Sequence, residues 1–238
     1  EIKGGKQIIG VAAGAGISAI YAERGGADII LALNSGRYRQ MGRSSIAGFM
    51  PYGSSNEMVR EYASRELRPL IRKASLIFGL NATDPLIDLE EYIEDIGDMQ
   101  FEGIINYPTL ALIDGQFNEA LEECGISYRA DVEAIRIAHE KDLLTIAFIS
   151  NEAQAKDMID AGSDIICINC GFTGGGVMGA KKVLTLEEAK KRAVRVFDVC
   201  EGIRPGVIKM VYGGPVKTPL DVKYMISRNI GSPRSLLV

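Results

Sequence analysis

The sequence has few of the residues from which several classes of active site are built. Its 238 residues include no tryptophan and one histidine, His139. A metal centre made of several histidines is therefore excluded. A Ser-His-Asp triad would depend on His139, which falls in the middle of a predicted helix, RIAHEKD. We expect that helix to lie on the outside of the fold, away from any site of that kind.

Cysteine is also scarce, with four residues in the chain: Cys124, Cys167, Cys170 and Cys200. Cys167 and Cys170 form a CxxC pair, a spacing found in metal and redox sites. The pair lies in DIICINCG, which has the composition of a β-strand, where positions i and i+3 point to opposite faces. No second CxxC occurs. We therefore interpret the cysteines as buried thiols rather than as metal ligands or a redox pair.

Neither an excess of basic charge nor a long apolar run is present. The formal net charge is −4, and acidic and basic residues are interspersed, whereas nucleic-acid binding requires a basic face. No apolar run approaches the roughly 20 residues of a membrane span. The first residues lack the layout of a signal peptide. We expect a cytoplasmic protein with no nucleic-acid partner and no membrane partner.

The chain alternates short apolar runs with segments of helical periodicity. The runs are rich in Ile, Val and Leu and are predicted strands, at 7–14, 27–33, 76–80, 103–107, 144–149, 163–169 and 207–214. The predicted helices lie at about 17–23, 56–71, 89–99, 116–124, 131–141, 151–161, 185–202 and 218–228. Asn151 and Thr185 are expected N-caps, and Thr185 with Glu188 forms a capping box.

Uniformly apolar strands between helices indicate a parallel sheet that is covered on both faces. Such an α/β chain is either a doubly wound sheet or a TIM (β/α)8-type barrel. Seven strand-helix units with no break in composition favour the barrel, as one domain over 1–238.

The eighth unit of this barrel is expected to be truncated or atypical. After Asn229 the chain reads IGSPRSLLV, which is too short for both a strand and a helix. An incomplete barrel would leave unpaired edges on the first and seventh strands. We expect the tail or a partner chain to cover these edges, and a homo-oligomer is one way to do so.

Candidate site residues fall where the predicted strands end, which is where barrels bind their ligands. Glycines follow the first, sixth and seventh strands, and their amides could cradle a phosphate or carboxylate. The alternative is ordinary turn chemistry. These glycines are Gly14, Gly174, Gly175, Gly176, Gly213 and Gly214.

The predicted loop after the second strand is rich in arginine, with Arg37, Arg39 and Arg43 among glycine and serine. Arginine binds carboxylates and phosphates through two parallel hydrogen bonds, so Arg37 and Arg43 are candidate anion ligands. The alternative is a solvated surface loop, although long loops in compact domains are often functional.

Polar side chains form a third group of candidates. Asn34, Ser35, Asn81 and Asn106 could orient a ligand. The catalytic candidates are the carboxylates, which could also hold Mg²⁺. Each has an ordinary alternative, as a helix cap, a turn residue or a charge near a helix N-terminus. They are Asp84, Asp114 and Glu133.

Common nucleotide-binding motifs are absent from the sequence. There is no P-loop, and no GxGxxG follows a strand in the Rossmann manner. The segment AGAGIS comes close, but the second predicted strand ends in LALNSG, without the acidic residue that would bind a ribose.

Several long motifs resemble one known family. They are IIGVAAGAGISA, ADIILALNSGRYRQMGRSSIAGFMPYG, FGLNATDP, GIINYPTLALIDGQF, DVEAIRIAH, AGSDIICINCGFTGGGVMGAKK and YGGPVKTP. Together they are similar to the phosphoenolpyruvate hydrolase-like TIM barrels, and to the barrel half of plant antiviral resistance proteins. The resemblance implies a TIM barrel and a link to phosphoenolpyruvate or phosphonopyruvate chemistry. Related mutase-type enzymes use Mg²⁺ and an acidic cluster, for which Asp84 and Asp114 are the nearest candidates here.

Two functions are compatible with these observations. The first is an enzyme that acts on a small phosphorylated or carboxylated metabolite by hydrolysis or lyase chemistry, with Mg²⁺ as a candidate cofactor. The second is a non-catalytic ligand-sensing or protein-interaction barrel, which the scarcity of acid-base residues favours. One fold hosts many functions, so the barrel does not decide between them.

Overall fold

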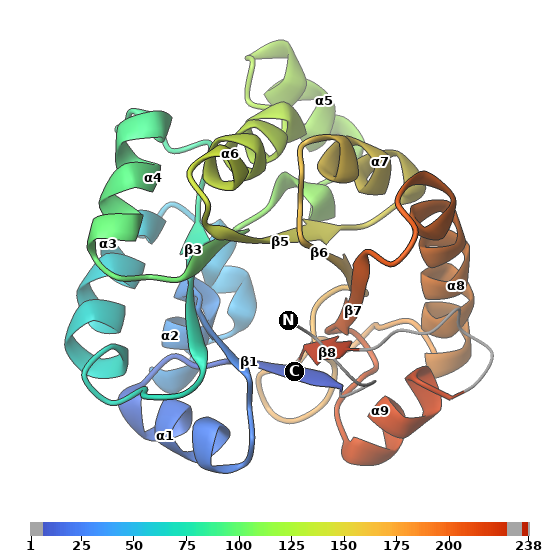
Figure 1. The fold of residues 1–238 in the computed structure, drawn as a ribbon. Helices are drawn as coiled ribbons and strands as arrows, with labels where there is room; N and C mark the ends of the chain where they lie inside the picture. The colour runs from blue at the N-terminus through green and yellow to red at the C-terminus, as the bar shows by residue number, and fades with distance from the viewer. Residues whose placement is uncertain (1–6, 228–234, 238) are drawn as a thin grey trace.

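The strands form a curved ring at the centre of the protein (Figure 1). The computed structural model describes residues 7–227 and 235–237. Eight parallel strands lie in the order β7-β6-β5-β4-β3-β2-β1-β8. They are β1 (Ile8–Ala12), β2 (Ile29–Ala32), β3 (Ser75–Leu80), β4 (Gly103–Asn106), β5 (Leu144–Ile149), β6 (Ile165–Asn169), β7 (Ile208–Tyr212) and β8 (Ser235–Leu237). The predicted α/β fold of the TIM type is confirmed.

Helices surround the ring of strands (Figure 1). They are α1 (Gly16–Arg24), α2 (Asn34–Gln40), α3 (Ser55–Tyr62), α4 (Leu89–Asp98), α5 (Gly115–Glu123), α6 (Tyr128–Glu140), α7 (Glu152–Asp160), α8 (Leu186–Ile203) and α9 (Pro219–Met225). Shorter helical turns are η1 (Ser45–Phe49), η2 (Ala63–Leu67) and η3 (Leu110–Leu112). None of the helices in the described part of the chain is long and apolar enough to cross a membrane.

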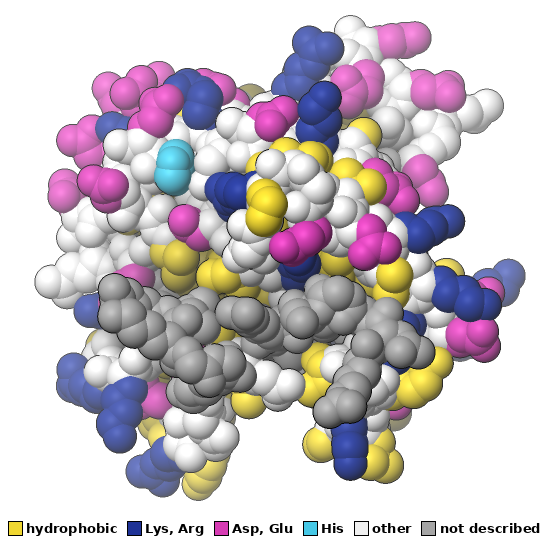
Figure 2. All heavy atoms as spheres, turned by 45° about the vertical axis from the view of Figure 1, so that its right-hand side comes forward, with side chains coloured by type: hydrophobic (Ala, Val, Ile, Leu, Met, Phe, Trp, Pro, Cys, Tyr) yellow, Lys and Arg dark blue, Asp and Glu magenta, His cyan; other side chains and the backbone are white. Residues whose placement is uncertain are grey.

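Local sequence fixes the ends of several helices as predicted. The Asn151 side chain accepts a hydrogen bond from the Gln154 amide at the start of α7. Thr185 and Glu188 form the predicted capping box of α8. His139 is exposed on α6, on the outer ring, as predicted. Figure 2 shows one face of the protein, which carries both acidic and basic side chains.

The strands are apolar on both faces because each separates two hydrophobic clusters. Leu31 packs inside the ring, whereas its neighbour Ile30 packs against the helices. Cys167 and Cys170 likewise belong to the inner and outer clusters, as strand geometry predicts. The cysteines are free thiols, three of them buried. The prediction that all four are buried was wrong for Cys124, which is exposed at the end of α5.

The predicted count of seven strands was too low by one. Ser235–Leu237 forms β8, which pairs in parallel with β1, with Ile9 opposite Leu236. A strand of three residues gives too weak a pattern to recognise in a sequence. Within the described residues β8 covers the edge of β1, which is one of the two expected arrangements. Asn229 lies outside the described residues.

The segment after β2 was predicted as a loop and instead contains α2 and η1. Its asparagine, serine and glycine residues give little helix propensity, so tertiary contacts stabilise α2. A Cβ atom on Gly14 would lie 2.0 Å from the Gly36 carbonyl oxygen, which shows how closely β1 and α2 approach. Arg37 then donates to the Gly14 carbonyl oxygen at 3.3 Å.

Candidate functional site

Aromatic rings fill the centre of the barrel at the carboxyl ends of the strands. Phe148 lies between Tyr107 and Tyr212, with ring centroids 5.8 and 5.0 Å away. Phe49 of η1 contacts Tyr107 at 5.5 Å and Phe172, on the segment after β6, at 5.6 Å. These rings leave only a small opening, which we call the mouth pocket.

The mouth pocket has a volume of about 10 Å³, which is room for about one water molecule. Its polar groups are two tyrosines, a guanidinium, an amide and two hydroxyls, and it contains no carboxylate. Burial raises the pKa of Tyr107, so its hydroxyl stays protonated at neutral pH. The lining residues are Arg39, Ser45, Tyr107, Leu112, Asn169, Gly171, Phe172, Thr173 and Tyr212.

Asn34 and Ser35, at the end of β2, are both buried. The Asn34 Nδ2 group donates to the Gly48 carbonyl oxygen at 2.8 Å. Within residues 7–227 and 235–237, neither Asn34 Oδ1 nor Ser35 Oγ has a hydrogen-bond partner. Buried polar atoms of this kind are uncommon, because each loses the energy of its bonds to water. This end of the barrel therefore has unused capacity for hydrogen bonding.

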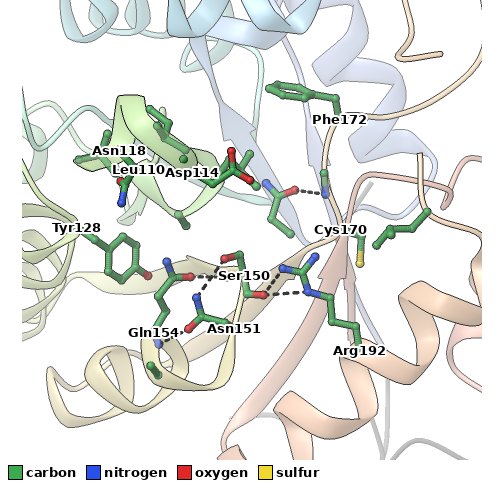
Figure 3. Close-up of a pocket in the computed structure, with 18 of the residues that line it drawn as sticks. Leu110, Asp114, Asn118, Tyr128, Ser150, Asn151, Gln154, Cys170, Phe172 and Arg192 are labelled. Atoms are coloured by element: carbon green, nitrogen blue, oxygen red, sulfur yellow. Dashed lines mark hydrogen bonds between the residues drawn. The ribbon is translucent and has the colours of Figure 1, made fainter. Parts of the chain in front are cut away.

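A larger cleft of about 910 Å³ opens beside the mouth pocket (Figure 3). Its walls come from η3 and α5 after β4, from the start of α7 after β5, and from the segments that precede and begin α8. Leu112, Asn169, Gly171 and Phe172 line both spaces. A ligand in the cleft could therefore reach toward the mouth pocket.

Arg192 of α8 lies at one side of the cleft (Figure 3). Its Nε donates to the Ser150 carbonyl oxygen at 3.0 Å, and its Nη2 donates to the same atom. The Ser150 amide in turn donates to Gln154 Oε1 at 2.6 Å. No carboxylate pairs with Arg192 in the part of the chain that the structure describes. Its position is fixed by a neutral carbonyl, which leaves its positive charge uncompensated.

Cys170 also lines the cleft, and Figure 3 shows its sulfur on the side of Arg192. Burial raises the pKa of the Cys170 thiol to about 11, and the nearby charge of Arg192 lowers it only in part. The thiol therefore stays protonated at neutral pH. A thiolate is the nucleophilic form, so Cys170 is placed to pack against a ligand rather than to attack it.

Asp114 is the predicted catalytic residue that the structure places in the cleft. It precedes α5, yet its side chain makes no capping hydrogen bond. Figure 3 shows the carboxylate directed toward the cleft. The wall of the cleft that carries η3 and α5 therefore has three exposed carboxylates, Asp114 and, on α5, Glu119 and Glu122.

Asp84 and Asn81 lie elsewhere, in a hydrogen-bonded joint between the β3 loop and α3. Asn56 is fully buried and its side chain accepts from the Asn81 amide at 2.9 Å. Its Nδ2 donates to Asp84 Oδ2 at 3.2 Å, and Ser54 donates to the same oxygen at 3.3 Å. These bonds occupy Asp84 in the structure of the loop, outside both pockets.

The predicted arginine loop does reach the site, but through a different residue. Arg39 lines the mouth pocket and donates to Ser45 Oγ at 3.1 Å. Arg37 instead forms an ion pair with Glu66 at 2.9 Å, and Arg43 is exposed outside both pockets. The composition of the loop predicted an anion-binding element. Which of its arginines faces the mouth pocket depends on the helical geometry of α2, which the composition does not show.

Glu133 is exposed on α6, where it pairs with Arg136, Oε2 to Nε, at 2.9 Å. It lines neither pocket. A carboxylate two residues earlier on the same helix, Asp131, is buried beside the cleft wall and was missed. The sequence could have indicated this burial. Asp131 lies four and seven residues before the apolar Ile135 and Ala138, and such spacing places it on the same, inner face of the helix.

Asp131 accepts three hydrogen bonds at its Oδ2 atom. The donors are Thr109 Oγ1 at 2.8 Å, Asn106 Nδ2 at 3.2 Å and the Leu110 amide at 3.3 Å. Burial raises the pKa of Asp131 to about 6, although these three donors act to lower it. Asn106, a predicted ligand residue, is itself buried and accepts from the Phe148 amide at 2.6 Å.

The predicted glycines connect the loops after β6 and β7. The Gly174 amide donates to the Gly214 carbonyl oxygen at 3.1 Å, and the Gly214 amide donates to that of Gly171 at 2.8 Å. A Cβ atom on Gly213 would lie 2.4 Å from the Gly171 carbonyl oxygen. The amides of Gly174 and Gly214 are thus used within the protein. Gly175 and Gly176 follow with positive φ of 88° and 64°, in a turn.

The side chains present do not fit a metal centre built by the protein. Among the described residues, no group of three or more His, Cys, Asp or Glu side chains could hold a metal ion. Asp84 is bonded to the start of α3, and the carboxylates that line the cleft with Asp114 do not form a metal-binding group with it. Mg²⁺ sites usually combine one or two carboxylates with ligand and water oxygens.

Comparisons with known proteins identify relatives over most of the chain. A family model described as phosphoenolpyruvate hydrolase-like matches residues 1–232. The ToMV susceptible protein tm-1(GCR26) of Solanum lycopersicum is 38% identical over 231 residues, which are 97% of this chain and 30% of that protein. The chain spans about a third of the length of the curated relatives that it matches over most of its length.

Two solved structures share the fold at low sequence identity. One is a phosphonopyruvate hydrolase in complex with oxalate and Mg²⁺, with a TM-score of 0.60 and 13% identity over 98% of this chain and 75% of the other. The second is an oxaloacetate acetylhydrolase, with a TM-score of 0.61 and 13% identity over 99% of this chain and 76% of the other. At this identity the comparison establishes the fold.

Proposed function

Because this chain belongs to the phosphoenolpyruvate hydrolase-like family, we propose that it cleaves a small carboxylated or phosphorylated metabolite by hydrolysis or lyase chemistry. The family name and the names of the two barrels that share its fold support small anionic substrates. The position of the cleft, at the carboxyl ends of the strands, is the usual place for the active site of such a barrel.

The observation that carries the proposal is the uncompensated charge of Arg192 at the side of the cleft. A guanidinium matches a carboxylate or phosphate with two parallel hydrogen bonds. The Ser150 carbonyl fixes the orientation of this guanidinium before a ligand arrives, which lowers the entropy cost of binding. We assign Arg192 as the main anion ligand and Arg39, in the mouth pocket, as a second one.

Asp114 is the acid-base group that we assign in the cleft, since it is the predicted catalytic residue that faces this space. Tyr107 keeps its proton and can donate to an oxygen on which negative charge develops. Asn34 Oδ1 and Ser35 Oγ add unused polar atoms at the same end of the barrel. These residues could bind and orient a ligand and move one proton.

Mg²⁺ is the cofactor that the resemblance implies, and one structurally similar barrel is described with Mg²⁺. Because the described side chains do not form a metal centre, we derive no step through this ion. We expect anion binding to depend on arginine rather than on Mg²⁺. Equal affinities with and without the ion would agree with this expectation.

The test is calorimetric titration of the protein with oxalate, oxaloacetate and phosphonopyruvate, each with and without Mg²⁺, followed by assays of their cleavage. Arg192→Gln should weaken binding about tenfold to a hundredfold, because charged hydrogen bonds contribute about 1.5–3 kcal/mol. Arg195→Gln is the matched control, since Arg195 is an exposed arginine on the same helix. Equal affinities of the two variants, or no binding of any of the three anions, would overturn the proposal.

A second function, ligand sensing without turnover, is favoured by one observation. No cluster of three or more His, Cys, Asp or Glu side chains of metal-binding geometry occurs in the described residues, and the cleft thiol is protonated. Two results together would favour the sensor over the enzyme. The wild-type protein would bind one of these anions tightly without cleaving it, and the Asp114→Asn variant would bind the anion equally well.

We also propose that the protein works in the cytoplasm, as a homo-oligomer. Free cysteines are typical of a reducing compartment, and cysteines of this chain are free thiols. Cell fractionation checks the compartment. Light scattering during gel filtration checks the oligomeric state, and a monomer at micromolar concentration would contradict the second part.

A further inference from the structure

A buried carboxylate of α6 joins this helix to the segment after β4, beside the cleft. Asp131 has 1% of its surface exposed, and its Oδ2 atom accepts from Thr109, Asn106 and Leu110. All three donors belong to the segment that leaves β4 and enters η3. Within the described residues no cation pairs with Asp131. These neutral donors must therefore compensate the whole of its charge.

The same three donors determine the position of one cleft wall. Leu110 begins η3, and the segment continues through Leu112 to Asp114, all of which line the cleft. The Ala111 amide donates to Thr109 Oγ1 at 3.1 Å, so the hydroxyl that bonds Asp131 also holds the first turn of η3. The wall is thus attached to α6 through a single carboxylate oxygen.

Asn106 extends this network to the neighbouring strand. The Nδ2 group of Asn106 donates both to Asp131 and to the Phe148 carbonyl oxygen, the latter at 3.1 Å. Tyr128, which lies one turn before Asp131 on α6, donates to the same carbonyl at 2.9 Å and lines the cleft. The carboxylate, the amide and the phenol therefore fix η3 relative to β5 and α6.

We propose that Asp131 is a positioning residue of the cleft, whose carboxyl group holds the η3 wall and Asp114 in the place that ligand binding requires. The inference rests on the proposed function, because it concerns the same cleft. Asp131 lines neither pocket itself, and it acts through Thr109, Asn106 and Leu110. Burying a carboxylate at this point costs free energy, because the charge is removed from water. Such a cost fits a functional role better than a purely structural one.

The ionisable groups around Asp131 are few. On α6 itself the neighbour is Tyr128, whose pKa is raised by burial first and then by the charges of Asp131 and of Asp157 on α7. The groups of β4, β5 and η3 that hydrogen-bond to Asp131 or to the Asn106 side chain are uncharged. α4 meets the far end of α6, where Lys141 pairs with Glu94 at 3.1 Å. A local pH effect near about 6 can therefore be assigned to Asp131.

Any motion of the wall that exposes Asp131 to water has a defined pH dependence. The carboxyl group has a pKa of about 6 when the wall is closed, against an ordinary value of 3.8 in water. Opening releases the buried charge, so it becomes easier as pH rises from about 4 to about 7, by about a hundredfold in its equilibrium constant. The wall is therefore tightest in acid and loosens as Asp131 ionises.

Amide hydrogen exchange of the ligand-free protein tests the proposal directly. The amides of Leu110, Ala111 and Ile113 report on the wall, since each donates a hydrogen bond there. Asp131→Ala should lower their protection factors at least about tenfold, and Asp131→Asn should abolish their pH dependence. Glu140→Gln, an exposed carboxylate on the same helix, is the control and should change neither.

A milder pair of variants covers the case in which Asp131→Ala does not fold. Thr109→Val removes the shortest donor and should raise the pKa of Asp131, measured by carboxyl NMR, whereas Thr109→Ser should restore the wild-type value. Unchanged protection of η3 in both Asp131→Ala and Thr109→Val overturns the proposal. Titration with oxalate separates the two hypotheses. If oxalate does not bind while the protection of the η3 amides still depends on pH, the proposed function is contradicted and the positioning role of Asp131 is supported.

Discussion

At the scale of single residues, Asp131 has a measurable effect on stability. Its pKa in the folded protein, about 6, is above its ordinary value of 3.8, so the folded state binds the proton more tightly than the unfolded state does. The contribution of Asp131 to stability is therefore present in full below about pH 4 and is lost as pH rises to about 6. The loss amounts to about 3 kcal/mol for a fully buried carboxyl group.

Urea denaturation between about pH 4 and pH 7 measures this change. The wild-type protein should lose more stability over this range than Asp131→Asn, whose side chain does not titrate. Other carboxyl groups titrate in both proteins, so the difference between the two curves isolates Asp131. Parallel curves would mean that Asp131 keeps an ordinary pKa in the folded protein.

The candidate site shows what single residues reveal in a sequence and what they conceal. Asp114 was identified because it follows a predicted strand, and the structure places it in the cleft. Arg192 was missed because it lies well inside the predicted long helix, where nothing in the pattern distinguishes it. Its relevance depends on the Ser150 carbonyl, 42 positions earlier in the chain. Long-range contacts of this kind cannot be inferred from one sequence.

At the scale of elements, most of the fold could be predicted. Strands and helices with strong apolar periodicity match the structure closely, and the predicted limits of β5 and the caps of α7 and α8 are correct. α2 was missed because its stability comes from contact with the end of β1 rather than from its own residues. Local propensity is a weak guide wherever tertiary contact decides.

Gly14→Ala tests the dependence of α2 on this contact. The added Cβ atom would lie 2.0 Å from the Gly36 carbonyl oxygen and 2.5 Å from the Arg37 amide nitrogen, so α2 must move. We expect a loss of about 3 kcal/mol in the free energy of unfolding, the upper range for overpacking. Gly202→Ala is the control, since a Cβ atom there meets nothing within 4 Å. Similar stabilities of the two variants would refute the account of α2.

At the scale of the whole molecule, the barrel depends on the three-residue strand β8. β8 pairs with β1 through three residues, and without it β1 would be a sheet edge with unpaired backbone groups. A variant that lacks residues 235–238 should therefore have a lower melting temperature and form larger assemblies than the wild type as concentration increases. Thermal denaturation and light scattering measure both effects. An unchanged assembly size and melting temperature would show that β8 contributes little.

The glycine contacts between the loops after β6 and β7 have a consequence for protein engineering. Because these bonds join backbone atoms, the two loops are fastened at Gly171, Gly174 and Gly214, and a turn closed by the bridge between Gly174 and Ala180 follows this joint. Val177 lies at the tip and is fully exposed. An exposed tip beyond a rigid base is a favourable position for insertions. A peptide tag or a fluorescent label placed between Val177 and Met178 should therefore leave the barrel intact, while it reports on events at the mouth of the cleft.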